Sequence, residues 1–192
     1  EEILSRTFFN NHKDIFYKFY FEEMLYPNAR PNKAHLALAT LEKEGKLRAV
    51  ITQNIDGLHQ DAGSKNVIEL HGSVRRNHCI KCRGFYNEEE MIKYRGICPV
   101  CGSYIKPDVV LYEESLNDNV VDKAIYYIST CDVLIVGGTS LSVYPAASFI
   151  RYFKGKYLIL INRDKTSYDD YASIVIHDSI GKVLESVINQ KM

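Results

Sequence analysis

The chain has 192 residues, 46% of them hydrophobic, and its 24 basic residues balance its 24 acidic ones. This length and composition suffice for one or two domains with a buried core. The balanced charge argues against a nucleic-acid-binding protein, which would carry a basic surplus or stripe. No apolar run approaches the length of a membrane span, which is about 20 residues, so we do not expect a membrane partner. From the charge balance we do not expect a nucleic-acid partner either.

The chain opens with an aromatic segment, residues 8–25, whose side chains are typical of core packing rather than of a ligand site. Pro27 and Pro31 end this helical segment. Asn32 is then placed to cap a second helix, which Gly45 ends. The opening residues, Glu1 to Leu4, lack the basic and apolar regions of a secretory signal.

Short apolar runs alternate with helical patterns along the rest of the chain, which indicates an α/β protein with a largely parallel sheet. Residues 109–112 are also predicted to be extended, but their pattern indicates membership of this sheet less strongly. Helices are expected near 120–129, 146–152 and 180–189, and strands at 47–52, 67–70, 133–136 and 157–161.

Four cysteines form two C-x2-C pairs: Cys79 with Cys82, and Cys98 with Cys101, fifteen residues further on. Four thiolates at these spacings can converge on one tetrahedral zinc ion about 2.3 Å away. The alternative is four unrelated reduced cysteines, for which nothing would require two C-x2-C pairs in one short segment. All four ligands are protein sulfurs, so the site is predicted to be structural. This cysteine usage favours a reducing compartment over a disulfide scaffold. The compactness of the chain further leads us to expect a cytoplasmic protein. The fifth cysteine, Cys131, is interpreted as a small buried hydrophobic residue rather than as a nucleophile.

Polar or glycine-rich segments follow four of the apolar runs, where open α/β sheets bind their ligands. Each has an ordinary alternative when taken alone: a polar turn, a structural histidine or a tight glycine turn. A histidine followed by glycine also suits a general base, because its pKa lies near neutrality. The segments are Gln53-Asn54-Ile55-Asp56, His71-Gly72, Gly137-Gly138-Thr139-Ser140 and Asn162-Arg163-Asp164.

Together and in this order, these motifs resemble those of the sirtuins, the NAD-dependent protein lysine deacylases. The resemblance also includes 107–112, Gly138 to Leu141 and Tyr144 to Ala147, and it extends from Asn32 or earlier to the C-terminus. It implies a Rossmann-like parallel sheet with helices on both faces, formed by residues 1–76 and 107–192, of which 1–31 are the helical part of a small domain. A zinc-binding module, residues 77–106, would be inserted in it. The implied cofactors are NAD and Zn²⁺.

The resemblance also implies a reaction, in which the acyl-lysine oxygen attacks the nicotinamide ribose as nicotinamide leaves, and the acyl group ends on ADP-ribose. His71 would be the general base, assisted by Asn54 at the ribose. The substrate would be an acyl-lysine protein or peptide that adds as a strand to Val109, Val110, Leu111 and Tyr112, with Tyr20 near the acyl group. The implied cofactor contacts are Gln53, Asn54, Ile55, Asp56, Gly138, Thr139, Ser140, Asn162, Arg163, Asp164 and Ile180.

Three features depart from the sirtuin pattern. Tyr112-Glu113-Glu114 replaces the usual Phe-Gly-Glu, and glutamate adopts positive φ less readily than glycine, so we expect the loop to differ. Desuccinylating sirtuins carry a Tyr-x-x-Arg motif, whose arginine is absent here. The third residue after Tyr17 is Tyr20, and the third residue after Tyr20 is Glu23, so an uncharged acyl group is predicted. The strand, Gly-Ala-Gly turn and Pro-Asp-Phe-Arg loop that begin sirtuins, which include the pyrophosphate turn, do not appear before Glu1. We therefore expect either that these residues belong to a longer protein or that the protein is a truncated form.

Two alternatives stay open. In mono-ADP-ribosyl transfer, another nucleophile would capture the same sugar. In a zinc-knuckle binding module without catalysis, the basic residues near the cysteines, Arg75, Arg76, Lys81 and Arg83, would form a docking surface, although such charges are also ordinary solvated groups. We expect the protein to act as a monomer.

Overall fold

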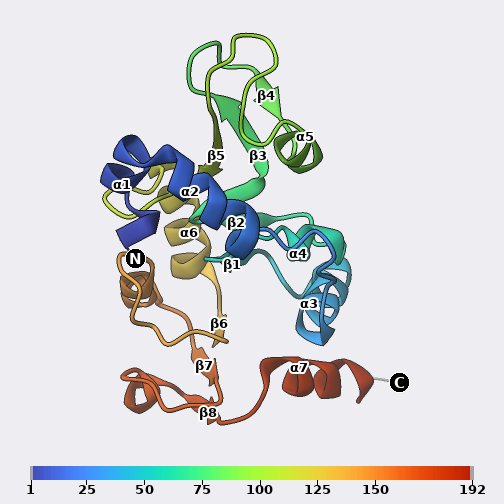
Figure 1. The fold of residues 1–192 in the computed structure, drawn as a ribbon. Coiled ribbons are helices and arrows are strands. Elements are labelled where there is room, and N and C mark those ends of the chain that lie inside the picture. The colour runs from blue at the N-terminus through green and yellow to red at the C-terminus, as the bar shows by residue number, and fades with distance from the viewer. Residues whose placement is uncertain (1, 191–192) are drawn as a thin grey trace. The chain divides into compact units, whose positions relative to one another are not determined.

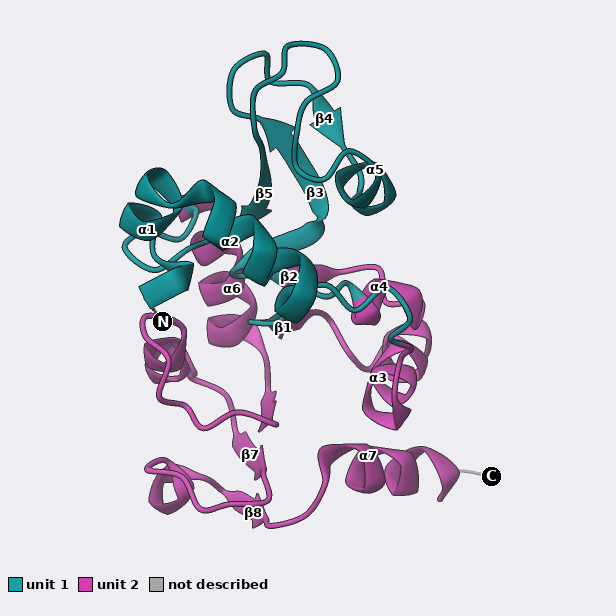
Figure 2. Cartoon of the chain, in the orientation of Figure 1, with its two compact units in different colours: residues 1–29, 52–57, 69–117 teal, residues 30–51, 58–68, 118–192 magenta. Residues whose placement is uncertain are grey.

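The computed structural model describes residues 2–190, in which helices alternate with short strands (Figure 1). The chain divides into two compact units, which Figure 2 colours separately. Unit 1 comprises residues 1–29, 52–57 and 69–117, and unit 2 comprises residues 30–51, 58–68 and 118–192. Within the described range, no helix combines the length and the apolar character needed to cross a membrane.

Unit 1 begins with the helical segment that the aromatic residues predict. Ser5 caps its first α-helix by accepting a hydrogen bond from the Phe8 N–H. The backbone leaves helical geometry at His12, where φ is −136°, so the predicted helical segment consists of short pieces. These are the 3-10 helix η1 (Glu2–Leu4), α1 (Arg6–Asn11), α2 (Lys13–Phe19) and the π-helical turn η2 (Tyr20–Met24).

A three-stranded antiparallel sheet in the order β4-β3-β5 forms the rest of unit 1, together with α5 (Glu88–Lys93). Its strands are β3 (Gly72–Cys79), β4 (Phe85–Tyr86) and β5 (Ile105–Val109). β3 and β4 are not predicted by the sequence because neither contains an apolar run. The strand expected at 109–112 is wrong in its bounds: β5 ends at Val109, and Tyr112 instead forms a single parallel bridge with Ser5.

The aromatic segment and this sheet share one hydrophobic core. Phe16 and Tyr20 are fully buried, and the Phe16 ring packs edge-on against Phe9 with centroids 4.9 Å apart. The Tyr17 hydroxyl donates a hydrogen bond of 2.7 Å to the carbonyl of Ile105 on β5. Burying side chains of this size contributes about 1.5–3 kcal/mol each. The aromatic segment is therefore core, as its pattern predicts.

Unit 2 contains the parallel sheet β6-β7-β8, formed by β6 (Val133–Gly137), β7 (Tyr157–Ile161) and β8 (Ile174–Ile176). Successive side chains of β7 enter two different clusters, as expected for strand geometry. Leu158 and Leu160 pack in a cluster with residues of the 3-10 helix η3 (Ala146–Tyr152). Ile161 packs in another cluster with α3 (Lys33–Lys43) and α7 (Ile180–Asn189). The expected Rossmann-like sheet with helices on both faces is confirmed.

The other strands expected in this fold, at 47–52 and 67–70, are present as β1 (Val50–Thr52) and β2 (Val67–Glu69), which pair in a two-stranded sheet. The predicted cap is confirmed, because Asn32 forms a capping box at the start of α3. The segment 146–152 is a 3-10 helix rather than an α-helix. The remaining helices are α4 (Leu58–Asp61), α6 (Asp118–Thr130) and η4 (Asp169–Tyr171).

The units divide the chain differently from the domains that the sequence suggests. The four cysteines belong to unit 1 together with residues 1–29 and the whole of β3. The smaller zinc module expected at residues 77–106 lies inside that unit, and its bounds stay a prediction.

Glu113 has a positive φ of 72°, a conformation that glutamate adopts less readily than the glycine usual at this position in sirtuins. Its Oε2 accepts hydrogen bonds from the Thr7 N–H (2.9 Å) and the Thr7 hydroxyl (2.7 Å). These bonds hold the pKa of the Glu113 carboxyl below its usual range. The carboxylate also lies at the first turn of α1, where a helix favours negative charge. The tether to Thr7 therefore offsets the backbone strain at Glu113.

The contribution of the hydrogen bonds between Glu113 and Thr7 to stability should depend on pH. Because the Glu113 pKa is lowered in the folded state, its contribution to stability is present above the ordinary carboxyl pKa of about 4.3 and is lost as the pH falls through the lowered value. Thr7→Val should lower the melting temperature at neutral pH, and the difference from the wild type should shrink as the pH falls from about 6 toward about 3. Thr40→Val is the control, since its hydroxyl bonds only the Leu36 carbonyl within α3. An equal loss from Thr7→Val at every pH would contradict the tether.

β3 and β5 approach each other closely where β3 begins. Gly72 pairs with Val109 and has φ of 76°, and a Cβ at Gly72 would overlap the carbonyl oxygen of Asp108. Gly72→Ala should therefore lower the free energy of unfolding by at least about 3 kcal/mol, because backbone strain and a backbone clash act together. Gly45→Ala has a similar φ of 71° but open space around the new Cβ, so it should cost only about 1–2 kcal/mol. Urea unfolding measures both variants, and equal losses would show that the close approach does not matter.

Candidate functional site

The four predicted metal ligands converge within unit 1. Their Sγ atoms all lie within 4.8 Å of one another. Cys79 Sγ is 3.4 Å from Cys101 Sγ, and Cys82 Sγ is 3.6 Å from Cys98 Sγ. Four sulfurs at the corners of a tetrahedron about 2.3 Å from a zinc ion would stand about 3.8 Å apart. The donor set and its spacing therefore fit zinc.

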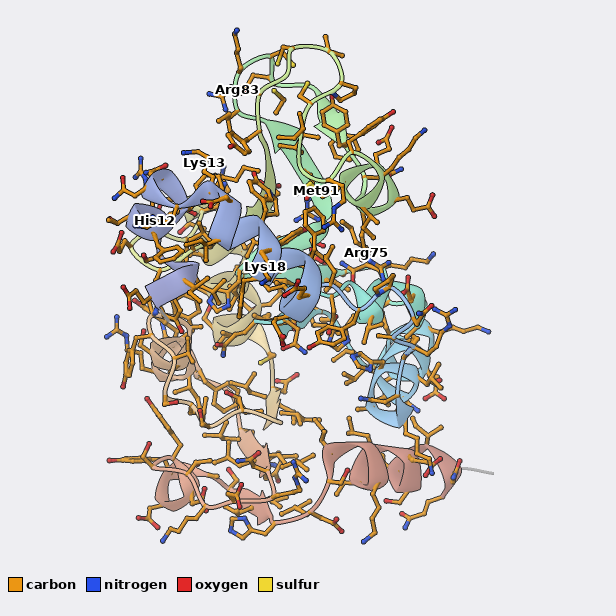
Figure 3. All side chains as sticks on the ribbon, viewed as in Figure 1. His12, Lys13, Lys18, Arg75, Arg83 and Met91 are labelled. Carbon is orange, nitrogen blue, oxygen red and sulfur yellow. The ribbon has the colours of Figure 1, made fainter. Side chains whose placement is uncertain are left out.

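The backbone around the cysteines supports this geometry. The N–H groups of Lys81 and Cys82 both point at Cys79 Sγ, each at 3.4 Å. Arg83, on the loop after the first pair (Figure 3), has φ of 63°, and Gly102 after the second pair has φ of 68°. Such left-handed residues let each pair turn back tightly. Both knuckles are thus formed by the protein backbone itself.

The Cys98 thiol accepts hydrogen bonds from both a buried side chain and the backbone. Burial opposes its ionisation, but hydrogen bonds from the Tyr86 hydroxyl and from the backbone of Cys101 and Val100 outweigh it and lower the pKa of Cys98 to about 6. A thiol that ionises readily is a good metal ligand. Cys131 differs, because burial raises the pKa of its thiol, but the residue is only half-buried, so the full burial expected from the sequence is not confirmed.

The predicted general base, His71, lies between β2 and β3 and is half-buried. Its Nδ1 is 3.0 Å from the carbonyl oxygen of Gln53. Because a carbonyl only accepts hydrogen bonds, Nδ1 carries the proton in this contact, and Nε2 of the neutral ring is left with its lone pair. The structure therefore brings two predicted motifs together and fixes the tautomer of the imidazole, and the role of His71 as a general base stays a prediction.

The first residues of β3 hold the rest of the 53–57 segment. The Val74 N–H and the Ser73 hydroxyl both donate to the carbonyl of Ile55, at 3.0 and 3.3 Å. Arg75 Nε donates to the carbonyl of Asp56 at 3.1 Å (Arg75 is labelled in Figure 3). The Arg75 side chain also covers Gly57, where a Cβ would overlap it. Neither Ser73 nor Arg75 is among the residues predicted for the site, since no local motif marks a side chain that acts through backbone carbonyls.

The predicted cofactor residues of unit 2 gather where β6 and β7 end. The Gly138 N–H donates to the carbonyl of Ile161 at 3.1 Å, and Gly138 has φ of 65°. Gly137 lies against the Ile180 side chain so closely that a Cβ would overlap it. Asn162 follows β7 directly, and its side chain donates to the carbonyl of Asp164 at 3.1 Å. These segments are thus neighbours in the fold, although they are far apart in the sequence.

The hydroxyl groups of this loop are engaged with one another and with the backbone. Thr139 Oγ1 accepts a hydrogen bond from the Leu141 N–H at 3.1 Å, and Ser140 Oγ lies 2.5 Å from Ser142 Oγ. Ser140 and Arg163 are exposed. The predicted roles of Thr139, Ser140 and Arg163 toward a cofactor stay predictions.

The predicted peptide edge, 109–112, uses part of its backbone within unit 1. The Val110 N–H donates to the His71 carbonyl at 3.0 Å, and the Tyr112 N–H donates to the Leu4 carbonyl at 2.9 Å. Val109 and Leu111 are buried, whereas the Tyr112 side chain is 45% exposed. The role of this segment in binding a substrate stays a prediction.

Tyr20, which the resemblance places at the substrate, is fully buried in the core of unit 1. Its ring stacks on Phe16, and its hydroxyl lies 3.5 Å from Asn77 Oδ1. The helical turn directs this side chain inward, so we assign Tyr20 to the core and not to the surface that meets a substrate.

Comparisons with known proteins identify the family. The model of the Sir2 family matches residues 1–145. A NAD-dependent protein deacetylase of Clostridium acetobutylicum is 57% identical, over 98% of this chain and 78% of that protein, and one of Clostridium perfringens is 56% identical, over 98% and 79%. A solved Sir2 with a p53 peptide and NAD+ has a TM-score of 0.91 at 38% identity, covering 100% of this chain and 83% of that one. The chain therefore belongs to the Sir2 family.

Proposed function

We propose that the protein is an NAD-dependent protein lysine deacetylase, which transfers the acyl group from lysine to ADP-ribose and releases nicotinamide. The observation that carries the proposal is the contact of His71 Nδ1 with the Gln53 carbonyl, which leaves the lone pair of Nε2 to act as the base. Membership of the Sir2 family and the names of its relatives support the same activity.

NAD, when bound, supplies a ribose carbon that becomes electrophilic as nicotinamide leaves. The chain's own residues then have distinct tasks. Ile55 and Asp56 hold the carboxamide, and Asn54 orients the ribose. His71 takes a proton from the ribose hydroxyl network at Nε2. Hydrogen bonds from β3 fix the backbone of residues 55–57. They support this assignment, because residues that are already positioned accelerate a reaction more than mobile ones.

The other cofactor contacts belong to unit 2. Gly138, Thr139 and Ser140 would meet phosphate and ribose oxygens, Asn162 with Arg163 and Asp164 the second ribose, and Ile180 the adenine. Their meeting at the ends of β6 and β7 supports this role, since open α/β sheets bind ligands at the carboxyl ends of their strands. Zinc, held by the four cysteines, would cross-link the two knuckles and take no part in the reaction.

The substrate would be an acyl-lysine peptide that pairs with residues 109–112. Solved Sir2 proteins bound to acetylated and propionylated peptides support a peptide substrate with an uncharged acyl group. We place the protein in the cytoplasm and expect it to act as a monomer.

Substitution of the base tests this function. His71→Ala should leave the fold intact but lower the rate of deacetylation about 10²- to 10⁴-fold, the usual contribution of a positioned base. The measurement follows nicotinamide and deacetylated product with an acetyl-lysine peptide, with and without NAD. His12→Ala, at the junction of α1 and α2, is the matched control and should keep its turnover. A His71→Ala variant that retains most of the wild-type turnover would remove the assignment.

The acyl preference is tested with peptides that differ only in the acyl group. Neither register of the desuccinylase motif supplies a cation, because the third residue after Tyr17 is Tyr20 and the third residue after Tyr20 is Glu23. A succinyl carboxylate would have to be desolvated without a partner, which costs several kcal/mol. The kcat/KM for succinyl-lysine should therefore be at least about 100-fold below that for acetyl-lysine. Release of succinate at the rate of acetate or faster would overturn the prediction.

A further inference from the structure

One buried hydroxyl group lies against the metal ligands. The Tyr86 hydroxyl oxygen is 3.0 Å from Cys98 Sγ, and Tyr86 and Cys98 are only 6% and 1% exposed. Tyr86 lies on β4, opposite Asn77 of β3. The Asn77 side chain donates to the Tyr86 carbonyl at 3.2 Å, which anchors the backbone from which the ring projects. The hydroxyl is therefore held in place from the strand side.

We propose that Tyr86 is a positioning residue of the metal centre, whose hydroxyl donates a hydrogen bond to the Cys98 thiolate and thereby strengthens metal retention. A metal-bound thiolate has no proton, so the tyrosine must be the donor in this contact. Four thiolates around one divalent cation leave a net negative charge, and a buried charge needs hydrogen-bond donors. Cys98 is more buried than Cys101, the other cysteine of its pair, so it depends more than Cys101 on a donor from the protein.

Packing alone does not explain the hydroxyl group. The Tyr86 ring belongs to the core of unit 1 and meets Tyr94 edge-on, with centroids 6.1 Å apart. Phenylalanine would fill the same space without having to satisfy a buried O–H. The hydroxyl finds its partner in the sulfur, so the extra oxygen serves the ligand and not the core.

The structure offers a matched comparison. Tyr86→Phe removes the oxygen that touches Cys98, while Tyr94→Phe makes the same chemical change on the neighbouring ring. Outer partners of metal ligands typically change metal affinity 10- to 100-fold. Tyr86→Phe should therefore bind zinc about 10- to 100-fold more weakly in competition with a chromogenic chelator, and Tyr94→Phe should match the wild type.

Cobalt replacement separates positioning from packing. A hydrogen bond stabilises the sulfur lone pairs, so its loss should move the thiolate-to-cobalt charge-transfer band of the Co²⁺-exchanged protein to lower energy. The zinc-loaded variants are first compared by circular dichroism and thermal unfolding. Weaker zinc binding with the shifted band supports the proposal. Unchanged zinc binding, or weaker binding with an unshifted band, overturns it.

If Tyr86→Phe does not fold, 3-fluorotyrosine placed at position 86 alone replaces it. This residue keeps the ring and the hydroxyl, but its more acidic O–H is a stronger donor. The charge-transfer band should then move to higher energy, the opposite direction from the phenylalanine variant. A band that stays in place would overturn the proposal, because it would show that the hydroxyl does not act on the sulfur.

Discussion

The hydrogen bonds of β3 are the constraint on which the rest of unit 1 depends. This strand begins beside His71 and ends at Cys79, so the candidate base and the first metal ligand lie at its two ends. Its pairing with β5 shifts register between Ser73 and Asn77. Within this irregular stretch, the Val74 N–H donates to the carbonyl of Ile55 instead of following a regular ladder, and the Arg75 side chain donates from Nε to the carbonyl of Asp56. A metal that fixes one end of β3 therefore stabilises the strand that shapes the candidate site at its other end.

A fully buried asparagine shows how strongly this arrangement is specified. Asn77 has no exposed surface, and its amide donates to the carbonyls of Val74 (3.0 Å) and Tyr86 (3.2 Å). A buried amide without partners would cost several kcal/mol, so any other register of β3 and β4 is penalised. The irregular stretch of β3 is thus held by a side chain from the strand itself. The same bonds set the position of Tyr86 beside the metal ligands.

The sequence predicts the parts of this protein that depend on local chemistry. The cysteine spacing predicts a cluster that the structure confirms, and the apolar alternation of residues 157–161 predicts β7. β3 has no such signal, because its sequence is mostly polar and it becomes a strand through its pairing with β5. Tyr20 fails for a related reason: a motif placed it by spacing, but the direction of its side chain is set by the core around it. Glu113 shows the reverse case, in which a rule of local conformation is overcome by a bond to Thr7, 106 residues away in the sequence.

The candidate residues fall into two groups, and contacts inside one unit hold each group. In unit 1 the imidazole is oriented by Gln53, and Asp56 is held by Arg75. In unit 2 the close fit of Gly137 to Ile180 and the bond from Gly138 to Ile161 join the glycine turn to the ends of two other segments. Preorganisation within a unit means that neither group must wait for a ligand to become ordered. It also means that damage to the contacts of one group need not disturb the order of the other.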